Sequence, residues 1–209
     1  MTRRVVVLDY GSGNVHSAVR ALTAAGAEVT LSSDPRDVYE AHGLVVPGVG
    51  AFPAVMNLLR AVDAPRLIDR RLAASRPVLG ICVGLQVMFA RSTEHGGGEG
   101  LGQWEGEVRR LDAEVVPHMG WTPVRAHPDS TLMRGLDGEY FYFVHSYAVT
   151  VDPFAHMGPP LTPPRVSWAH HGSDFIAAVD NGALCATQFH PEKSSHAGQH
   201  LLRNWLGML

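Results

Sequence analysis

The sequence predicts an α/β fold with a mostly parallel central sheet flanked by helices and an antiparallel extension at one edge. Over the first 90 residues, short apolar runs alternate with segments whose apolar residues recur at helical spacing, which is typical of a parallel sheet covered on both faces. After GGGEGLG at residues 96–102, the runs read as antiparallel strands. Asn181-Gly182 lies between two such runs and is a strong hairpin signal.

The first half predicts four buried strands with helices between them. The first helix carries apolar residues at i, i+3, i+4 and i+7, namely Val15, Ala18, Val19 and Leu22. Loops at the carboxyl ends of parallel strands carry ligands, so we expect the functional residues there. The strands are expected over residues 3–9, 28–32, 43–47 and 77–82, and further helices over 51–62 and 65–74.

The second half predicts paired strands at one edge of the sheet. Residues 152–164, DPFAHMGPPLTPP, are proline-rich and predict a surface loop. With no internal repeat and no linker, the 209 residues are expected to form one domain. The strands are expected over 106–112, 139–149, 164–170 and 175–188, and a last helix is expected to bury Leu202, Trp205, Leu206 and Leu209.

The composition argues against several classes of function. A formal net charge of -3 and a pI near 6.4 supply no basic surface for nucleic acid. No apolar stretch approaches the roughly 20 residues that span a bilayer, and no signal-peptide pattern is present, so we expect a cytoplasmic protein without membrane contact. We expect no metal, and we interpret the following histidines as surface or local hydrogen-bonding residues: His118, His145, His170 and His171.

The run PVLGICVGLQ places Cys82 between Gly80 and Gly84. Packing is one interpretation, because an unpaired cysteine is among the most buried residue types. Gly-x-nucleophile-x-Gly is also the sharp strand-to-helix turn that presents one strained, exposed side chain. A helix that begins just after Cys82 would direct free N–H groups at the sulfur and favour the thiolate. Cys82 is therefore a candidate nucleophile, whereas Cys185, inside an expected strand, is expected to lie in the core.

The run QFHPEK supplies a candidate base for this cysteine. Residues two positions apart in extended chain point to the same side, so His190 and Glu192 are expected to face one way. A carboxylate that holds a histidine in one tautomer and stabilises its imidazolium completes a catalytic triad. A solvated His-Glu pair is the alternative, and the combination with GICVG favours the triad.

The run VVPGVGAF supplies candidate N–H donors for an oxyanion. Gly48 and Gly50 let the backbone come close to a substrate, and the N–H of Val49 would then point inward. The second donor would be the N–H of Val83, next to the nucleophile. Taken alone, PGVG is an ordinary turn after a strand.

With PGVG, GICVGLQ and QFHPEK in chain order, the sequence resembles the class I, triad-type glutamine amidotransferases over nearly its whole length. YGSGN, PGVGAF, PHMGW, YFVHSY and QFHPEKS are similar to motifs of one branch, the glutaminase subunits of imidazole glycerol phosphate synthase. The resemblance implies one amidotransferase domain, 1–209, that hydrolyses L-glutamine through a cysteinyl thioester without a cofactor. It also implies a heterodimer with a cyclase subunit that serves L-histidine biosynthesis.

The resemblance implies a role for individual residues as well. Cys82 would be the nucleophile, His190 the base and acid, and Glu192 the group that orients the histidine. Glutamine would be held near Gly48, Val49, Gly50 and Gln86, and by the backbone of Ser146 and Tyr147. The cyclase would dock over the active site, with contacts from Asn14, Trp121 and Tyr142, although plain packing is the alternative for Trp121.

Two other functions stay open at this point. The ammonia could serve another synthesis, such as that of pyridoxal phosphate or anthranilate, although PGVG, PHMGW and YFVHSY favour the histidine pathway. The chain could also be a non-enzymatic α/β regulatory module, against which the intact set of candidate triad residues argues. Thr122 stands where relatives of this kind usually carry asparagine, and the loop at 152–164 is longer than the family pattern leads us to expect.

Overall fold

The computed structural model describes residues 2–11, 13 and 15–209, so Asn14, an expected partner contact, lies outside the described residues. The helices are α1 (Val15–Ala24), α2 (Pro35–Glu40), α3 (Phe52–Ala61), α4 (Ala64–Ala73), α5 (Val83–Gln86) and α6 (Ser195–Leu206), with 3-10 turns η1 (Glu94–Gly96) and η2 (Pro191–Lys193). The strands are β1 (Arg3–Leu8), β2 (Ala27–Ser32), β3 (Gly43–Gly48), β4 (Val78–Cys82), β5 (Phe89–Ser92), β6 (Gly98–Glu99), β7 (Trp104–Arg110), β8 (His118–Pro123), β9 (Tyr140–His145), β10 (Tyr147–Ala148), β11 (Arg165–His171), β12 (Ser173–Asn181) and β13 (Leu184–Thr187).

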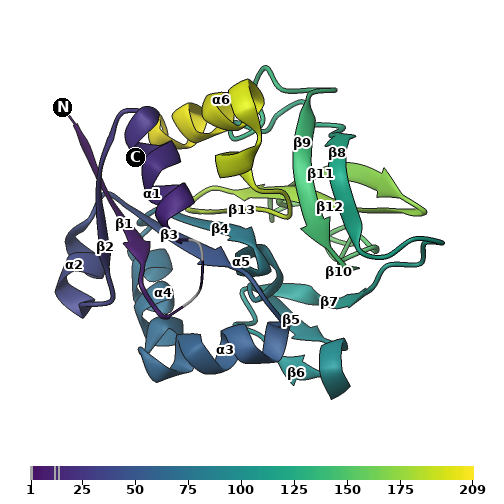
Figure 1. Cartoon of the computed structure of the whole chain (residues 1–209), viewed down its shortest axis with the longest axis horizontal. Helices are drawn as coiled ribbons and strands as arrows, with labels where there is room; N and C mark the ends of the chain where they lie inside the picture. The colour runs from purple at the N-terminus through teal and green to yellow at the C-terminus, as the bar shows by residue number, and fades with distance from the viewer. Residues whose placement is uncertain (1, 12, 14) are drawn as a thin grey trace.

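The described residues form a central seven-stranded sheet in the order β11-β12-β13-β4-β3-β1-β2. The five strands from β13 to β2 are parallel, and β12 and β11 continue the sheet in antiparallel pairing at one edge. Helices α1 and α6 cover one face and α3 and α4 the other (Figure 1). Every residue of β3 and β4 is buried, as expected for central strands covered on both sides. The predicted α/β fold is confirmed.

The helices follow the sequence signals that predict them. In α1 the apolar face buries Val15, Ala18 and Leu22, while Val19 is half-buried. Helix α2 begins at Pro35, and the carboxylate of Asp34 accepts the first free N–H groups of the helix. Helix α6 buries its apolar face against the sheet and α1. Helix α6 follows the QFHPEK segment directly in the sequence, so its packing also holds the end of that segment in place.

The hairpin at Asn181-Gly182 brings the end of the chain back to the centre of the sheet. Gly182 has φ of 63°, a left-handed conformation that suits glycine in the turn between β12 and β13. Strand β13 then runs parallel to β4, with Thr187 opposite Ile81. The residues that follow β13 therefore lie beside the residues that follow β4.

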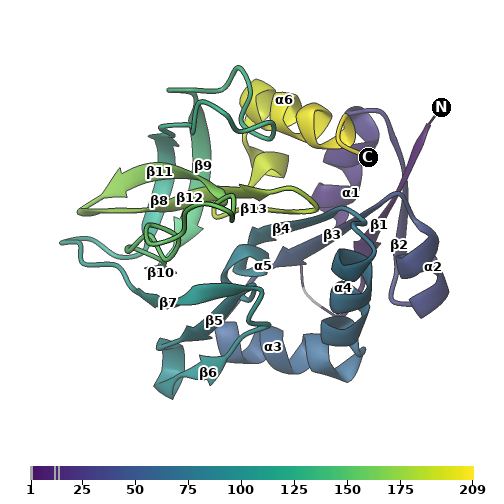
Figure 2. The same cartoon turned by 180° about the vertical axis from the view of Figure 1, so that it is seen from behind.

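The strands between residues 89 and 148 do not join the edge of the main sheet, which differs from the prediction of one antiparallel extension. In the described residues, they form a four-stranded sheet, β10-β7-β5-β6, part of which lies beside α5, and a two-stranded sheet, β8-β9, which lies against β11 (Figure 2). The expected strand at 139–149 is broken at Ser146, because the chain changes partner there. Tyr142 pairs with Trp121 of β8, whereas Tyr147 pairs with Arg110 of β7.

Candidate active site

Cys82 lies at the junction of β4 and α5, where the backbone turns sharply. Its φ of 57° and ψ of -111° are strained for a residue with a side chain. The turn stays tight because a Cβ at Gly84 would lie 2.0 Å from the carbonyl oxygen of Val46, so only glycine fits. The predicted strand-to-helix turn is present, but the expectation that the turn exposes the thiol is wrong. Cys82 is only 3% exposed, because it lies at the bottom of a cavity.

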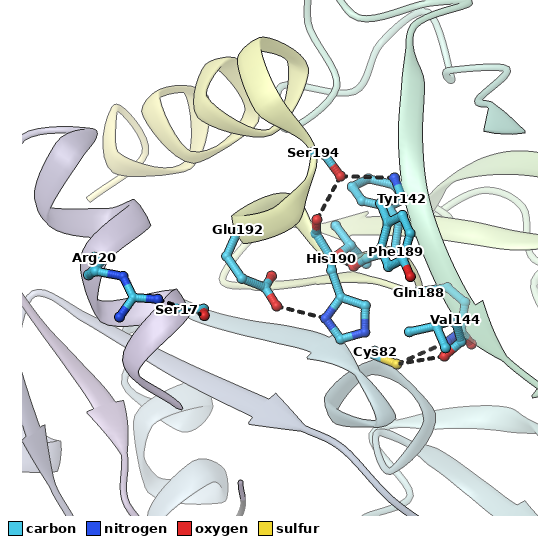
Figure 3. Close-up of polar contacts among 11 residues, drawn as sticks. Ser17, Arg20, Cys82, Tyr142, Val144, Gln188, Phe189, His190, Glu192 and Ser194 are labelled. Atoms are coloured by element: carbon cyan, nitrogen blue, oxygen red, sulfur yellow. Dashed lines mark hydrogen bonds and ion pairs between the residues drawn. The ribbon is translucent and has the colours of Figure 1, made fainter. Parts of the chain in front are cut away.

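His190 and Glu192 form a buried pair. The ring Nδ1 lies 2.7 Å from the carboxylate Oε1, and the side chains are 2% and 7% exposed. The pairing was predicted from extended chain, and that reason is wrong, because Glu192 lies in the 3-10 turn that begins at Pro191. Figure 3 shows the histidine ring between Glu192 and Cys82. The turn, not strand alternation, brings the two side chains together.

The charge state of His190 follows from its two neighbours. Burial lowers the pKa of His190, but interactions with Cys82 and Glu192 outweigh burial and raise it to about 9. The imidazolium is therefore favoured beside the sulfur. Within the described part of the chain, its buried Nε2 has no hydrogen-bond partner of ordinary geometry. This nitrogen is available for proton transfer to or from a bound molecule.

A cavity of about 220 Å³ opens above Cys82. It brings together eight residues predicted for catalysis or binding: Val49, Gly50, Cys82, Val83, Gln86, Ser146, Tyr147 and His190. Four further lining residues were not predicted from the sequence: Glu94, Val144, His145 and Lys193. Lys193 and His145 belong to the motifs QFHPEK and YFVHSY and could have been noticed, whereas Glu94 gave no local signal.

The loop after β3 forms one wall of the cavity. Val49 and Gly50 line it, and Gly50 has φ of +101°, a backbone conformation that favours glycine. Gly48 faces away, since a Cβ there would lie 2.5 Å from the backbone nitrogen of Gly84. The hydroxyl of Tyr10 donates to the carbonyl of Pro47 and attaches this loop to the end of β1.

Gln86 holds the opposite wall in place. Its Nε2 donates to the carbonyl of Tyr147 at 2.8 Å and to Oε1 of Gln188 at 3.1 Å. Nε2 of Gln188 lies 3.7 Å from Sγ of Cys82, within the range of a hydrogen bond to sulfur. Helix α5, the break between β9 and β10 at Ser146, and the segment that follows β13 thus meet at Cys82.

The two described residues expected to contact a partner lie on adjacent strands. Trp121 is 50% exposed, so its interpretation as plain packing is wrong. Its ring lies 6.0 Å from that of Tyr142, over which the ammonium of Lys193 is held at 5.8 Å. Because Lys193 also lines the cavity, this cluster connects an exposed surface with the site.

Cys185 lies in the core, as expected. It is fully buried in β13, and its sulfur lies 3.8 Å from a carboxylate oxygen of Asp180. Burial and the Asp180 charge raise the pKa of this thiol. A thiol in such surroundings is a poor nucleophile.

Across the described residues, no cluster of three or more His, Cys, Asp or Glu side chains is arranged to hold a metal ion. No helix in that part of the chain is both long and apolar enough to cross a membrane.

The family model described as "Glutamine amidotransferase class-I" matches residues 6–208. This chain belongs to the class I glutamine amidotransferases. The resemblance of its motifs to that family is thereby confirmed, and the chain is an enzyme of the glutamine amidotransferase type.

Relatives and solved structures agree with this family. An "Imidazole glycerol phosphate synthase subunit HisH" of Renibacterium salmoninarum is 60% identical over 210 residues, covering 100% of this chain and 96% of the relative. A protein of the same name from Leifsonia xyli subsp. xyli is 61% identical over 210 residues, with 100% of both chains covered. A solved glutamine amidotransferase has a TM-score of 0.73 at 19% identity, covering 97% of each chain, which shows a shared fold. The structure of PurLQS from Thermotoga maritima has a TM-score of 0.71 at 18% identity, covering 99% of each chain, and shows the same fold.

Proposed function

We propose that this amidotransferase is the glutaminase subunit of an imidazole glycerol phosphate synthase. It hydrolyses L-glutamine to glutamate and ammonia. A cyclase subunit uses the ammonia to make imidazole glycerol phosphate and an aminoimidazole carboxamide ribonucleotide in L-histidine biosynthesis. The observation that supports the chemistry best is the buried His190–Glu192 pair, at 2.7 Å, beside Cys82 in the cavity. The relatives at 60% and 61% identity support the choice of pathway.

In this proposal Cys82 attacks the side-chain amide of glutamine. Its thiolate forms a bond to the carboxamide carbon, and the carbonyl oxygen becomes an oxyanion. His190 gives its proton to the amide nitrogen, which leaves as ammonia when the carbon–nitrogen bond breaks. Water then attacks the thioester carbon while His190 takes its proton, and glutamate leaves as the thiolate is restored. Glu192 orients the ring and stabilises the imidazolium through Nδ1.

The oxyanion would be bound by two backbone N–H groups, those of Val49 and Val83. Val83 is the first residue of α5, whose N–H has no partner inside the helix. Val49 lies in the loop attached to β1 through Tyr10 and Pro47. Losing one such donor costs about two to three orders of magnitude in rate. The orientation of the Val49 amide is therefore a strong point of control.

The rest of the cavity would bind the amino-acid part of glutamine. We assign this role to the backbone of Ser146 and Tyr147, to Gln86 and to the loop residue Gly50, which line the cavity. Gly48, also expected to hold glutamine, does not line the cavity and instead packs against α5. Glu94 adds a carboxylate for the α-ammonium group of the substrate. This carboxylate is held in place because it accepts the N–H of Phe52 at 2.8 Å.

We also propose a cytoplasmic heterodimer of one amidotransferase domain, 1–209, with the cyclase docked over the cavity. Trp121 and Tyr142 are the described candidates for contact, and Asn14 remains a candidate from the sequence alone. A glutaminase that worked without its partner would destroy glutamine and release ammonia with no acceptor. The partner and its nucleotide ligand are therefore expected to switch on hydrolysis by turning the Val49 amide inward.

Glutamate release tests the proposal when it is measured for the chain alone, with the cyclase, and with the cyclase plus its nucleotide ligand. We expect very low activity alone, a large rise only with both additions, and none in Cys82→Ala. Hydrolysis by Cys82→Ala at the wild-type rate would contradict the assignment of the nucleophile. Stimulation by an anthranilate or pyridoxal phosphate synthase partner, with none by the cyclase, would assign the ammonia to that other acceptor.

A further inference from the structure

A row of hydrogen bonds, buried at its centre and part-buried at its two ends, runs from strand β8 to the cavity wall. Oγ1 of Thr122 lies 2.7 Å from Nε2 of His118, and Nδ1 of His118 lies 3.0 Å from Nε2 of His145. Nδ1 of His145 lies 3.0 Å from the carbonyl oxygen of Tyr147. His118 and His145 are paired residues of β8 and β9, and both are buried. The mechanism proposed above uses neither imidazole.

The chemistry of these groups allows only one order of protons. The carbonyl of Tyr147 can only accept, so Nδ1 of His145 carries a hydrogen. Burial lowers the pKa of His145 to about 3, and burial together with His171 lowers that of His118 to about 4, so both rings are neutral. A neutral ring has one donor and one acceptor. It follows that Nδ1 of His118 donates to His145.

The last hydrogen bond of the row joins His118 to Thr122. Because Nε2 of His118 is then an acceptor, the hydroxyl of Thr122 must donate to it. Every bond of the row has one donor and one acceptor, and reversing any one of them would place two acceptors or two donors against each other. The Tyr147 carbonyl, which can only accept, therefore fixes the tautomer of both histidines, and the hydroxyl of Thr122 completes the order as the donor to His118.

The far end of the row is part of the wall of the cavity. The Tyr147 carbonyl also accepts the amide of Gln86, which in turn donates to Gln188. Figure 3 shows Gln188 beside Cys82, where its Nε2 lies 3.7 Å from the sulfur. His145 lines the cavity itself, next to Ser146.

Resting on the glutaminase function above, we propose that His118 and His145 are positioning residues for glutamine, which hold the Tyr147 carbonyl and the adjoining cavity wall. The hydroxyl of Thr122 donates to Nε2 of His118 and so holds this ring in place against His145. Thr122 directly follows the exposed Trp121, so the row also connects the proposed docking surface to the substrate pocket. Two histidines are costly to bury when a pair of apolar rings would fill the same space, which argues that their hydrogen bonds are used.

Packing around His118 offers a matched control. His171 stacks on the ring of His118 at 4.3 Å between centroids, but its own Nε2 bonds to the carbonyl of Val115 and not to the row. His171→Phe keeps a stacked ring and leaves the row intact. Thr122→Val keeps the shape of the threonine and removes its hydrogen, and Thr122→Ser restores a hydroxyl.

The first readout is the ¹⁵N NMR signature of the imidazoles in the free chain, which needs no turnover. In the wild type we expect hydrogens on Nδ1 of both His118 and His145. Thr122→Val leaves Nε2 of His118 without a donor and should shift the ¹⁵N signal of that nitrogen, while Thr122→Ser and His171→Phe should keep the wild-type pattern.

The second readout is glutamine hydrolysis by the complex with the cyclase and its nucleotide ligand. Thr122→Val should raise KM by about twofold to tenfold, the range that one hydrogen bond supplies, and change kcat by less than about twofold. Thr122→Ser should restore KM. Wild-type imidazole signals or a wild-type KM in Thr122→Val would overturn the proposal, as would an equal rise in His171→Phe. A wild-type complex without glutaminase activity would instead contradict the proposed function, and the NMR readout would still decide the proton order.

Discussion

The backbone N–H of His190 donates to the carbonyl oxygen of Tyr142 at 3.0 Å, so the proposed base is attached to strand β9. Ser194 closes a ring around this bond. Its Oγ accepts the N–H of Tyr142 at 3.0 Å and donates to the carbonyl of His190 at 2.6 Å (Figure 3). Because Tyr142 lies opposite Trp121 in the β8-β9 pair, a movement of these strands would move the base.

Ser194→Ala tests this attachment. The substitution leaves the N–H of Tyr142 and the carbonyl of His190 without the hydroxyl, which is expected to cost about 1–3 kcal/mol of stability. We expect a lower kcat with little change in KM, because the base and not the pocket is displaced. Urea unfolding and steady-state glutaminase kinetics measure the two effects. Ser195→Ala, at the exposed neighbouring position, is the control. A wild-type kcat in a destabilised Ser194→Ala would show that the ring matters for folding alone.

The two cysteines are expected to differ in reactivity. A thiol-reactive glutamine analogue should form one adduct, on Cys82, because this sulfur lines the cavity beside His190. Cys185 is fully buried and is expected to remain unmodified. Peptide mass spectrometry locates the adduct, and Cys82→Ser is expected to abolish it. Cys185→Ala should lose some stability and keep its activity, so an inactive but folded Cys185→Ala would contradict the assignment.

His190 and Glu192 are expected to differ in importance. His190→Ala removes the group proposed to move protons and should reduce glutamine hydrolysis nearly as much as Cys82→Ala. Glu192→Gln should cost less, since an amide oxygen can still accept from Nδ1, although the imidazolium loses a charged partner. Glutamate release by each purified complex ranks the variants. A Glu192→Gln variant less active than His190→Ala would show that Glu192 does more than orient the ring.

Stability should fall as the pH falls from 6.5 towards 4. Burial lowers the pKa of His118 to about 4 and that of His145 to about 3, whereas an unfolded histidine titrates near 6.5. In this window the unfolded chain therefore binds protons that the native chain does not, and acid favours unfolding. The pKa of His190 is raised to about 9, so below about pH 6 it is protonated in the native state and largely protonated in the unfolded chain, and it adds little slope there.

The expected loss from these two groups is about 2 kcal/mol between pH 6 and pH 5. Urea midpoints at both pH values measure it. His118→Gln should reduce by about half the change in unfolding free energy between the two pH values. His196→Gln, at an exposed position, should leave that change as it is in the wild type. Equal slopes in the wild type and His118→Gln would show that other groups control acid unfolding.

The features predicted from the sequence are those with a local physical cause. The turn at Cys82 was predictable because close backbone contacts require glycine at Gly84, and the hairpin because its turn requires the left-handed conformation of Gly182. The pairing of His190 with Glu192 was predicted for the wrong reason, since the 3-10 turn at Pro191 replaces extended chain.

The unpredicted features depend on long-range packing. Glu94 enters the cavity because it accepts the N–H of Phe52, 42 positions away in the sequence. The break at Ser146 arises from a change of strand partner, which alternation in one segment does not reveal. The depth of Cys82, and with it the error about an exposed thiol, is set by the walls that the second half of the chain adds.

Docking of the partner is expected to depend on the aromatic pair of β8 and β9. Trp121 is 50% exposed on β8 and contacts Tyr142, whose ring holds Lys193 at the cavity. Large aromatic residues of this kind supply much of the energy of an interface, so Trp121→Ala should weaken binding to the cyclase by about tenfold or more. Val151→Ala is the control, because Val151 is 71% exposed and lies outside the β8-β9 pair. Titration calorimetry measures both affinities, and equal affinities would place the interface elsewhere.

Tyr142→Ala should raise the rate of the chain without its partner. Removing the ring frees Lys193 and loosens β9, to which His190 is attached, so the site is less firmly held in its resting arrangement. Tyr142→Phe keeps a ring beneath the ammonium and should keep the low rate. If the Val49 amide is the switch, stimulation of the wild type should appear in kcat and not in KM. Glutamate release, measured with and without the cyclase and its ligand, checks each expectation. A wild-type chain that hydrolyses glutamine at full speed alone would contradict the control mechanism and leave the triad assignment intact.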